Sequence, residues 1–204
     1  MTITWTNATV ELIIPVWPHS PPSPLNLTQL SSKRASADQP TVLLDRALTV
    51  QVLAHLGKAT IEQGGLLLGR LWRAKSEVEA QPPNPSLPVA ADLIELCTAI
   101  PALAAQGSAL SLSMDAAVWE TARRTCSDDA SGIDSPLRVV GWYHSHPNLS
   151  AFFSHTDRQT QAAFFSNAFS VGWVIDPFTS SDSATLDEAF YLGPESLPIE
   201  VTRR

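Results

Sequence analysis

Two histidines and an aspartate have the spacing of a metal site. His144 and His146 are two residues apart, and Asp157 follows eleven residues after the second histidine. Side chains at i and i+2 of a β-strand point to the same face, so both imidazoles can bind one metal ion. Asp157 adds a harder oxygen ligand. Two histidines and a carboxylate form the ligand set of a catalytic zinc site, whose fourth position is open for water.

The sequence around these residues predicts where the ligands lie. Residues 137–143 are rich in β-branched and aromatic side chains, which predicts a strand that runs into the histidines. Pro147 is expected to end the strand, because proline lacks the N–H that the ladder needs. Ser154, followed three residues later by Asp157, predicts the start of a helix with a capping box. The ligands are therefore expected at a strand end, opposite the first turn of a helix.

Each of these features has a commoner structural explanation when it is taken singly. Histidine pairs are usually structural or lie on the surface, and a Ser-x-x-Asp pair usually only caps a helix. The composite is far more specific: His-Ser-His-Pro at 144–147, then six residues, then Ser-x-x-Asp at 154–157. It resembles, at every defined position, the signature of the JAMM metalloproteases, which are also called MPN-plus or JAB-domain proteins.

The resemblance extends to other parts of the chain. That family requires an upstream glutamate, and Glu62 precedes a glycine-rich run at 64–69, which is similar to the family's helix-end glutamate and second strand. Residues 171–177 resemble the family's buried strand that ends in Asp-Pro. The resemblance covers roughly residues 41–193. It implies a fold similar to that of cytidine deaminases, with helices and a central curved sheet in a mixed α-β-α arrangement.

The resemblance also implies a role for each residue. The two histidines and Asp157 would hold one zinc ion per chain, with a bound water. Glu62 would take a proton from that water and pass it to the leaving amine. Without the glycine-rich context, a surface glutamate at a helix end would be the better interpretation of Glu62. Ser154 would cap its helix and help to stabilise the oxyanion of the tetrahedral intermediate.

Several neighbouring residues are expected to have other roles. Ser145 lies between the histidines, is predicted to point to the opposite strand face, and is interpreted as structural. His155 matches no family ligand. His55 is predicted on a helix as an ordinary polar residue. Phe152 and Phe153 precede Ser154, and one of the two is expected to pack in the core.

Composition and charge limit the function further. The chain has 204 residues, of which 44% are hydrophobic and 16% charged, which suits one globular domain. The net charge of −7 argues against nucleic acid or an anionic membrane as the main partner. No apolar run reaches spanning length, and no secretory signal is expected. Cys97 and Cys126 form no disulfide framework and fit a reducing cytoplasm, which is the expected location.

The remaining pattern predicts the elements that position the site. Residues 1–40 are expected to form a short strand at 9–14 and a proline- and serine-rich arm, and residues 41–204 the JAMM domain. The prolines at 75–88 predict a surface loop. Helices and strands do not alternate regularly, so the fold class is α+β. Strands are predicted at 41–44, 66–72, 93–100, 109–114, 137–143, 171–177 and 184–192, and helices at 47–59, 115–126 and 154–165.

The function implied by the resemblance is that of a zinc-dependent peptidase or isopeptidase. It would cleave after the C-terminal glycine of a ubiquitin-like protein, in deconjugation or in precursor processing. Two alternatives stay open: a hydrolase that releases a small adduct from a ubiquitin-like sulfur-carrier protein, and a non-catalytic MPN scaffold, against which the intact ligand set argues. The partner would be a ubiquitin-like protein or its conjugate, and an activating partner or a homodimer is left open.

Overall fold

The computed structural model describes residues 39–57, 60–73, 91–102, 116–133, 135–178 and 186–204. The predicted strands at 9–14 and 109–114 and the predicted loop at 75–88 lie outside these residues, as does almost all of the predicted arm. The division of the chain after residue 40 therefore stays a prediction. No helix in the described part of the chain is long and apolar enough to cross a membrane.

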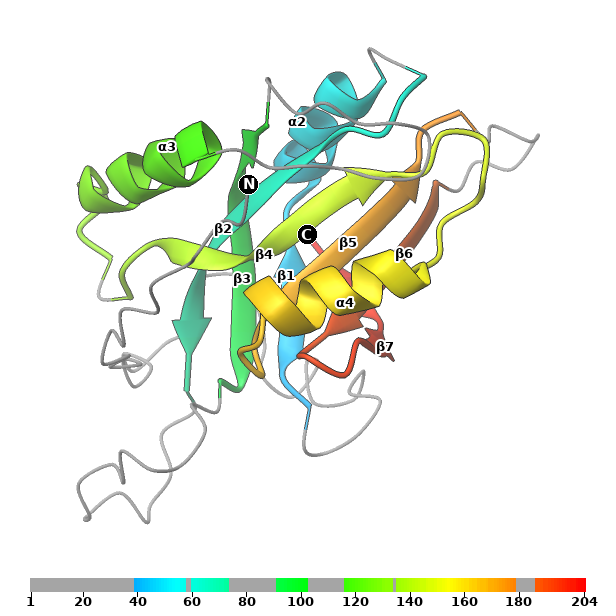
Figure 1. The fold of residues 1–204 in the computed structure, drawn as a ribbon. Coiled ribbons are helices and arrows are strands. Elements are labelled where there is room, and N and C mark those ends of the chain that lie inside the picture. The colour runs from blue at the N-terminus through cyan, green and yellow to red at the C-terminus, as the bar shows by residue number, and fades with distance from the viewer. Residues whose placement is uncertain (1–38, 58–59, 74–90, 103–115, 134, 179–185) are drawn as a thin grey trace.

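The described residues form one mixed sheet of eight strands with helices on both of its faces (Figure 1). In chain order the elements are β1 (Thr41–Leu44), α2 (Arg46–Leu56), β2 (Gly64–Trp72), β3 (Leu93–Pro101), α3 (Ala116–Ser127), β4 (Arg138–Ser145), α4 (His155–Phe164), β5 (Val171–Asp176), β6 (Asp187–Leu192), β7 (Leu197–Ile199) and β8 (Val201–Arg203). Their order in the sheet is β7-β6-β5-β4-β2-β3-β1-β8. The predicted strands that lie within the described residues are all present.

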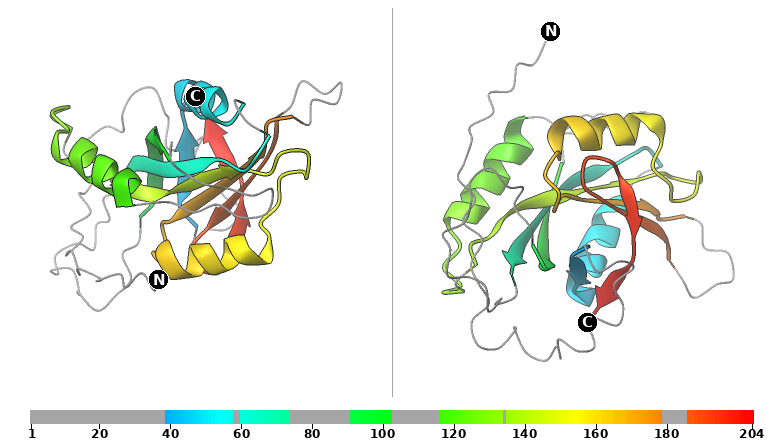
Figure 2. Two further views of the ribbon diagram at one scale, coloured as in Figure 1. Left: turned by 45° about the horizontal axis from the view of Figure 1, so that its top comes forward. Right: turned by 90° about the horizontal axis from the view of Figure 1, so that it is seen from below.

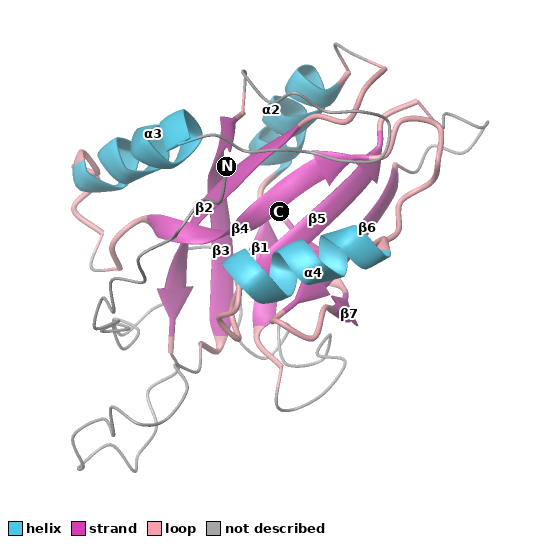
Figure 3. Cartoon of the chain, in the orientation of Figure 1, coloured by secondary structure: helices cyan, strands magenta, loops and turns pink. Residues whose placement is uncertain are grey.

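Two apolar clusters fill the space between the sheet and the helices, so the core has two layers (Figures 2 and 3). On one face, Leu48 and Val52 of α2 pack in a cluster with Trp173 of β5. On the other face, Val118 of α3 packs in a cluster with Trp142 of β4, and α4 covers the same face. The α+β class and the mixed α-β-α arrangement are therefore confirmed.

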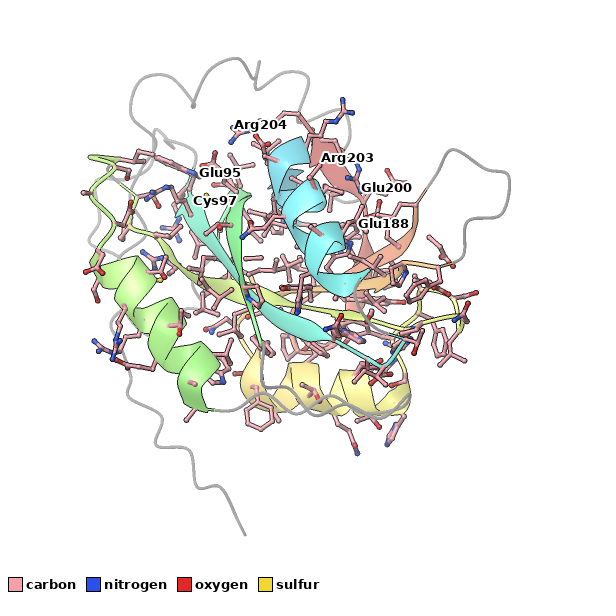
Figure 4. All side chains as sticks on the ribbon, turned by 90° about the horizontal axis from the view of Figure 1, so that it is seen from above. Glu95, Cys97, Glu188, Glu200, Arg203 and Arg204 are labelled. Atoms are coloured by element: carbon pink, nitrogen blue, oxygen red, sulfur yellow. The ribbon has the colours of Figure 1, made fainter. Side chains whose placement is uncertain are left out.

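The sheet is curved until its two edges nearly meet. β7 pairs with β6 and β8 pairs with β1, at opposite ends of the strand order, although only Glu200 separates β7 from β8. An ion pair links Arg203 of the edge strand β8 to Glu188 of β6, the strand next to the other edge (Figure 4). The strand predicted at 184–192 is present as β6, but it is not the last strand of the sheet. Two three-residue strands follow it, and they are too short to show an alternating pattern.

A β-bulge in β4 sets which face the histidines occupy. The register of β4 against β2 shifts so that Gly141 pairs with Leu67 but Val139 pairs with Leu68, which leaves Val140 unpaired. Val139 and Trp142 therefore pack in the same cluster, although they are three residues apart. Glycine is needed at the bulge, because a β-carbon at Gly141 would collide with the carbonyl of Val171 in β5. Beyond the bulge, alternate residues after Trp142 face α4.

Helix α2 is shorter than predicted, and this changes the place of Glu62. The helix ends at Leu56 rather than Ala59, and the N–H of Gly57 donates to the carbonyl of Leu53 at 2.9 Å. Glycine is unfavourable inside a helix by about 1 kcal/mol relative to alanine, which explains the early end. Glu62 thus lies in the connection between α2 and β2, and the prediction that it lies at the helix end was wrong.

Candidate metal centre

The end of β4 places two buried imidazoles on the face that α4 covers. His144 is 1% exposed and His146 is 3% exposed. The ring of His144 stacks on the indole of Trp142, with centroids 4.5 Å apart and planes 8° apart. The indole N–H of Trp142 donates to Oε1 of Gln161 in α4 at 2.6 Å. Strand and helix together therefore fix the orientation of His144.

The first turn of α4 carries the carboxylate of Asp157. Figure 1 shows α4 alongside β4 and β5. Ser154 is the N-cap, and its Oγ accepts a hydrogen bond from the N–H of Asp157 at 3.2 Å. In return, Oδ2 of Asp157 accepts the N–H of Ser154 at 2.7 Å. The predicted capping box is therefore present. It holds the carboxylate of Asp157 in one orientation, toward the two histidines.

The three side chains converge with the spacing of zinc ligands. Nε2 of His144 lies 3.2 Å from Nε2 of His146, and each of these nitrogens lies 3.3 Å from one carboxylate oxygen of Asp157. Ligands that lie about 2.0 to 2.1 Å from a tetrahedral zinc ion are about 3.3 Å from one another. Imidazole nitrogen and carboxylate oxygen are also ligands that zinc prefers. Both the geometry and the donor types therefore fit a zinc ion.

Electrostatics in the cluster favour the protonation states that a metal needs at two of the three side chains, His144 and Asp157. Burial lowers the pKa of His144. Burial raises the pKa of Asp157, but hydrogen bonds from His144 and His146 outweigh it and hold that pKa below its usual range. Burial lowers the pKa of His146, but the hydrogen bond and the charge of Asp157 outweigh it, so that pKa is raised. A neutral His144 beside an ionised Asp157 is ready to bind a divalent cation.

Glu62 lies beside the three converging side chains. It is 4% exposed, and its Oε1 lies 3.7 Å from Nε2 of His146. Burial raises the pKa of Glu62 to about 7; the charge of His146 opposes this shift, and the charge of Asp157 adds to it. A carboxyl group with a pKa near neutrality can accept a proton and give it back at neutral pH.

Comparison with known proteins identifies the family. Residues 45–183 match the model of the family described as prokaryotic homologs of the JAB domain, which covers more than half of the chain. The chain belongs to this family. The Lys-63-specific deubiquitinase BRCC36 of Camponotus floridanus is 37% identical to this JAB-domain protein over 59 residues, which are 28% of this chain and 23% of that protein. BRCC36 of Pongo abelii is 59% identical over 29 residues, 14% of this chain and 12% of that protein.

The matched segments of these deubiquitinases are thus less than a quarter of their length. A solved structure gives wider coverage of the fold. The solution structure of protein DSY2949 from Desulfitobacterium hafniense matches with a TM-score of 0.54 and 18% identity, over 80% of this chain and 93% of that chain. This likeness concerns the fold of the JAB-domain protein alone.

Other residues that the sequence singled out lie around the candidate centre or away from it. His155 is exposed on α4 and is not among the converging side chains. Phe153 is the phenylalanine that packs in the core, whereas Phe152 is 48% exposed and its ring centroid lies 5.1 Å from that of His146. His55 is more than an ordinary polar residue of α2, because it is buried and its Nδ1 lies 3.0 Å from the hydroxyl of Tyr143.

Sequence reasoning missed two residues that hold the centre in place. Gln161 accepts from Trp142 and donates to the carbonyls of Ser170 and Gly193 at 2.9 and 3.2 Å. A signal for Gln161 was present, because it follows Asp157 by four residues and so lies on the same helix face. The stacking of Trp142 on a histidine two residues later follows from the period of a strand.

Proposed function

We propose that this JAB-domain protein is a zinc-dependent metallopeptidase that cleaves the amide bond after the C-terminal glycine of a ubiquitin-like protein. The bond is either an isopeptide bond to a lysine or the first bond of a linear extension. The observation that carries the proposal is the convergence of His144, His146 and Asp157 at tetrahedral spacing, with Glu62 buried beside them. Family membership and the segments shared with Lys-63-specific deubiquitinases support it.

In this proposal the ligands hold the metal and two further residues do the chemistry. A zinc ion held by His144, His146 and Asp157 would supply a water whose pKa is lowered to about 7 and would polarise the substrate carbonyl. Glu62 accepts a proton from the attacking water and passes it to the nitrogen of the leaving amine. The carbon–nitrogen bond breaks, a carbon–oxygen bond forms, and the ubiquitin-like protein leaves with a free C-terminal carboxylate.

Ser154 serves the same reaction from the start of α4. Its Oγ accepts the N–H of Asp157, so its own O–H remains to donate to a developing oxyanion. The hydroxyl lies three residues before a proposed metal ligand and is held by the capping box. Ser154 therefore has two roles: it holds the ligand Asp157 in position, and it stabilises the transition state.

The expected substrate is an extended tail that ends in small residues. Phe152, half exposed beside His146, narrows the approach to the metal and favours glycine next to the cleaved bond. The net charge of −7 suits basic residues in such a tail.

A panel of ubiquitin fusions tests this function. Ubiquitin is joined through its C-terminus to a reporter protein, and its last two glycines are kept or changed to leucine. The native fusion should be cleaved after the terminal glycine, cleavage should stop on addition of a chelator, and the leucine variants should resist. Equal cleavage of the leucine variants would indicate a general peptidase. Binding of the fusion without any cleavage would favour the scaffold.

A further inference from the structure

The residue between the two histidines faces away from the candidate centre but is bound to the neighbour of Glu62. Ser145 is 0% exposed. Its backbone N–H donates to the carbonyl of Gln63 at 2.8 Å, and its Oγ accepts the N–H of Gln63 at 3.0 Å. The same hydroxyl lies 3.4 Å from the carbonyl oxygen of Gln63, to which it can donate. Both backbone groups of Gln63 are therefore held by one residue.

These contacts extend the pairing of β2 with β4 to the residue before the start of β2. The last pair in the register is Gly64 with His144. A regular antiparallel pair one step further would exchange two backbone hydrogen bonds. Here Ser145 makes one backbone bond, and its side chain receives the other N–H. The hydroxyl thus holds a segment that is no longer part of the strand.

The held N–H belongs to the peptide bond that joins Glu62 to Gln63. A peptide unit is planar, so the direction of its N–H fixes the plane that begins at the α-carbon of Glu62. Rotation of this plane would swing the side chain of Glu62 relative to the histidines. Such a rotation would change the distance between Oε1 of Glu62 and Nε2 of His146, which is 3.7 Å.

We propose that Ser145 is a positioning residue for Glu62, whose hydroxyl fixes the Glu62–Gln63 peptide and so aims the carboxylate at the centre. The inference rests on the proposed function, in which Glu62 moves the proton. The end of β4 would then serve the site from both faces. The two histidines on one face bind the metal, and Ser145 on the other face positions Glu62.

Removal of the hydroxyl should slow catalysis without removal of the metal. Displacement of a catalytic group by about 1 Å can reduce the rate about 100-fold. Ser145→Ala should therefore lower kcat by about 10- to 100-fold, with KM and one zinc per chain unchanged. Ser145→Thr keeps a hydroxyl and should recover most of the lost rate. The probe is ubiquitin linked through its C-terminus to a fluorogenic aminocoumarin.

The chain offers a matched control at the other end of β2. Ser135 is also 0% exposed, and its Oγ donates to the carbonyl of Leu71 at 2.8 Å. Ser135→Ala deletes the same hydroxyl from an equally buried site that also holds a backbone group of β2. It should lower the melting temperature, as Ser145→Ala should, but it should leave kcat unchanged. A comparable loss of kcat in both variants would reduce the role of Ser145 to general stability.

A double variant separates action through Glu62 from direct action. In the Glu62→Gln background, Ser145→Ala should cause no further loss of kcat, because the group that it positions is already gone. Additive losses would overturn the inference. If Glu62→Gln turned over at the wild-type rate, the proposed function would fail instead, which is a different outcome.

Amide hydrogen exchange gives a readout that needs no substrate. The N–H of Gln63 should exchange faster in Ser145→Ala than in the wild type, and at the wild-type rate in Ser145→Thr and in Ser135→Ala. Unchanged protection of this N–H in Ser145→Ala would overturn the inference whatever the activity. A wild type without turnover would contradict the proposed function alone, because the exchange rates report on the peptide itself.

Discussion

Two buried polar clusters lie toward opposite ends of the paired strands β2 and β4, and they are built in opposite ways. Toward the end of β2, Arg70 is 5% exposed, and its guanidinium meets acceptors in the described part of the chain. It donates to the carbonyl of Ser135 and to Oγ of Ser131, and it forms an ion pair with Asp129 at 2.8 Å. Among the residues that the structure describes, donors and acceptors of this cluster are matched, so it needs no further ligand.

The candidate metal centre is the reverse case. Two imidazole nitrogens and the oxygens of one carboxylate, all of them atoms that can bind a metal, point at one another across 3.2 to 3.3 Å. Without a cation, protons must separate these lone pairs. Buried polar groups are normally paired, so a buried group of converging atoms that can all bind a metal indicates a ligand rather than a structural role. The contrast teaches that the pairing of a buried cluster, more than its burial, distinguishes function from support.

The largest effect on turnover is expected at Glu62, beside the candidate metal centre. Glu62→Gln keeps the shape of the side chain but removes the base. It should lower kcat by about 10² to 10⁴, because that is the usual worth of general acid–base catalysis. Zinc content and melting temperature should stay near those of the wild type. Turnover at the wild-type rate would remove Glu62 from the mechanism.

A smaller effect is expected at Ser154, which contributes to both the fold and the chemistry. Ser154→Ala should lower kcat by about 10², the lower limit for one oxyanion donor. It should also lower the free energy of unfolding by about 1 kcal/mol, because the N-cap of α4 is lost. Steady-state kinetics and urea denaturation of the same preparation separate the two losses. A loss of stability with full kcat would leave Ser154 as a cap only.

No loss of turnover is expected when the cluster around Arg70 is disrupted. Arg70→Met removes the shared donor, and the buried carbonyl of Ser135 is left without its partner. The free energy of unfolding should fall by about 2 to 3 kcal/mol. Under conditions in which the variant is folded, zinc content and kcat should match the wild type. A loss of zinc in this variant would show that the two ends of the strands are coupled, against the comparison drawn above.

The candidate centre was readable from the sequence because its parts are local. His144 and His146 share a strand face, Ser154 and Asp157 share one helical turn, and both spacings have a direct chemical meaning. The strands that carry the core are long or apolar enough to show their pattern, as at Leu93–Pro101.

Other features depend on contacts between distant residues. The strand Val201–Arg203 exists because it pairs with β1, about 160 residues earlier in the chain, and three residues carry no pattern of their own. The bulge at Val140 is a property of the register with β2, and Gly141 marks it in the sequence without fixing which residue is left unpaired. The hydroxyl of Ser145 was interpreted as structural because its partner, Gln63, is 82 residues away.

The zinc content of two purified variants tests the central claim most directly. Elemental analysis should find one zinc per chain in the wild type and close to none in the double variant His144→Ala, Asp157→Ala, which removes two of the three converging ligands. The variant Arg70→Met, with its broken structural cluster, should keep one zinc per chain. Undiminished zinc in the double variant would contradict the account, because the metal would then be bound elsewhere.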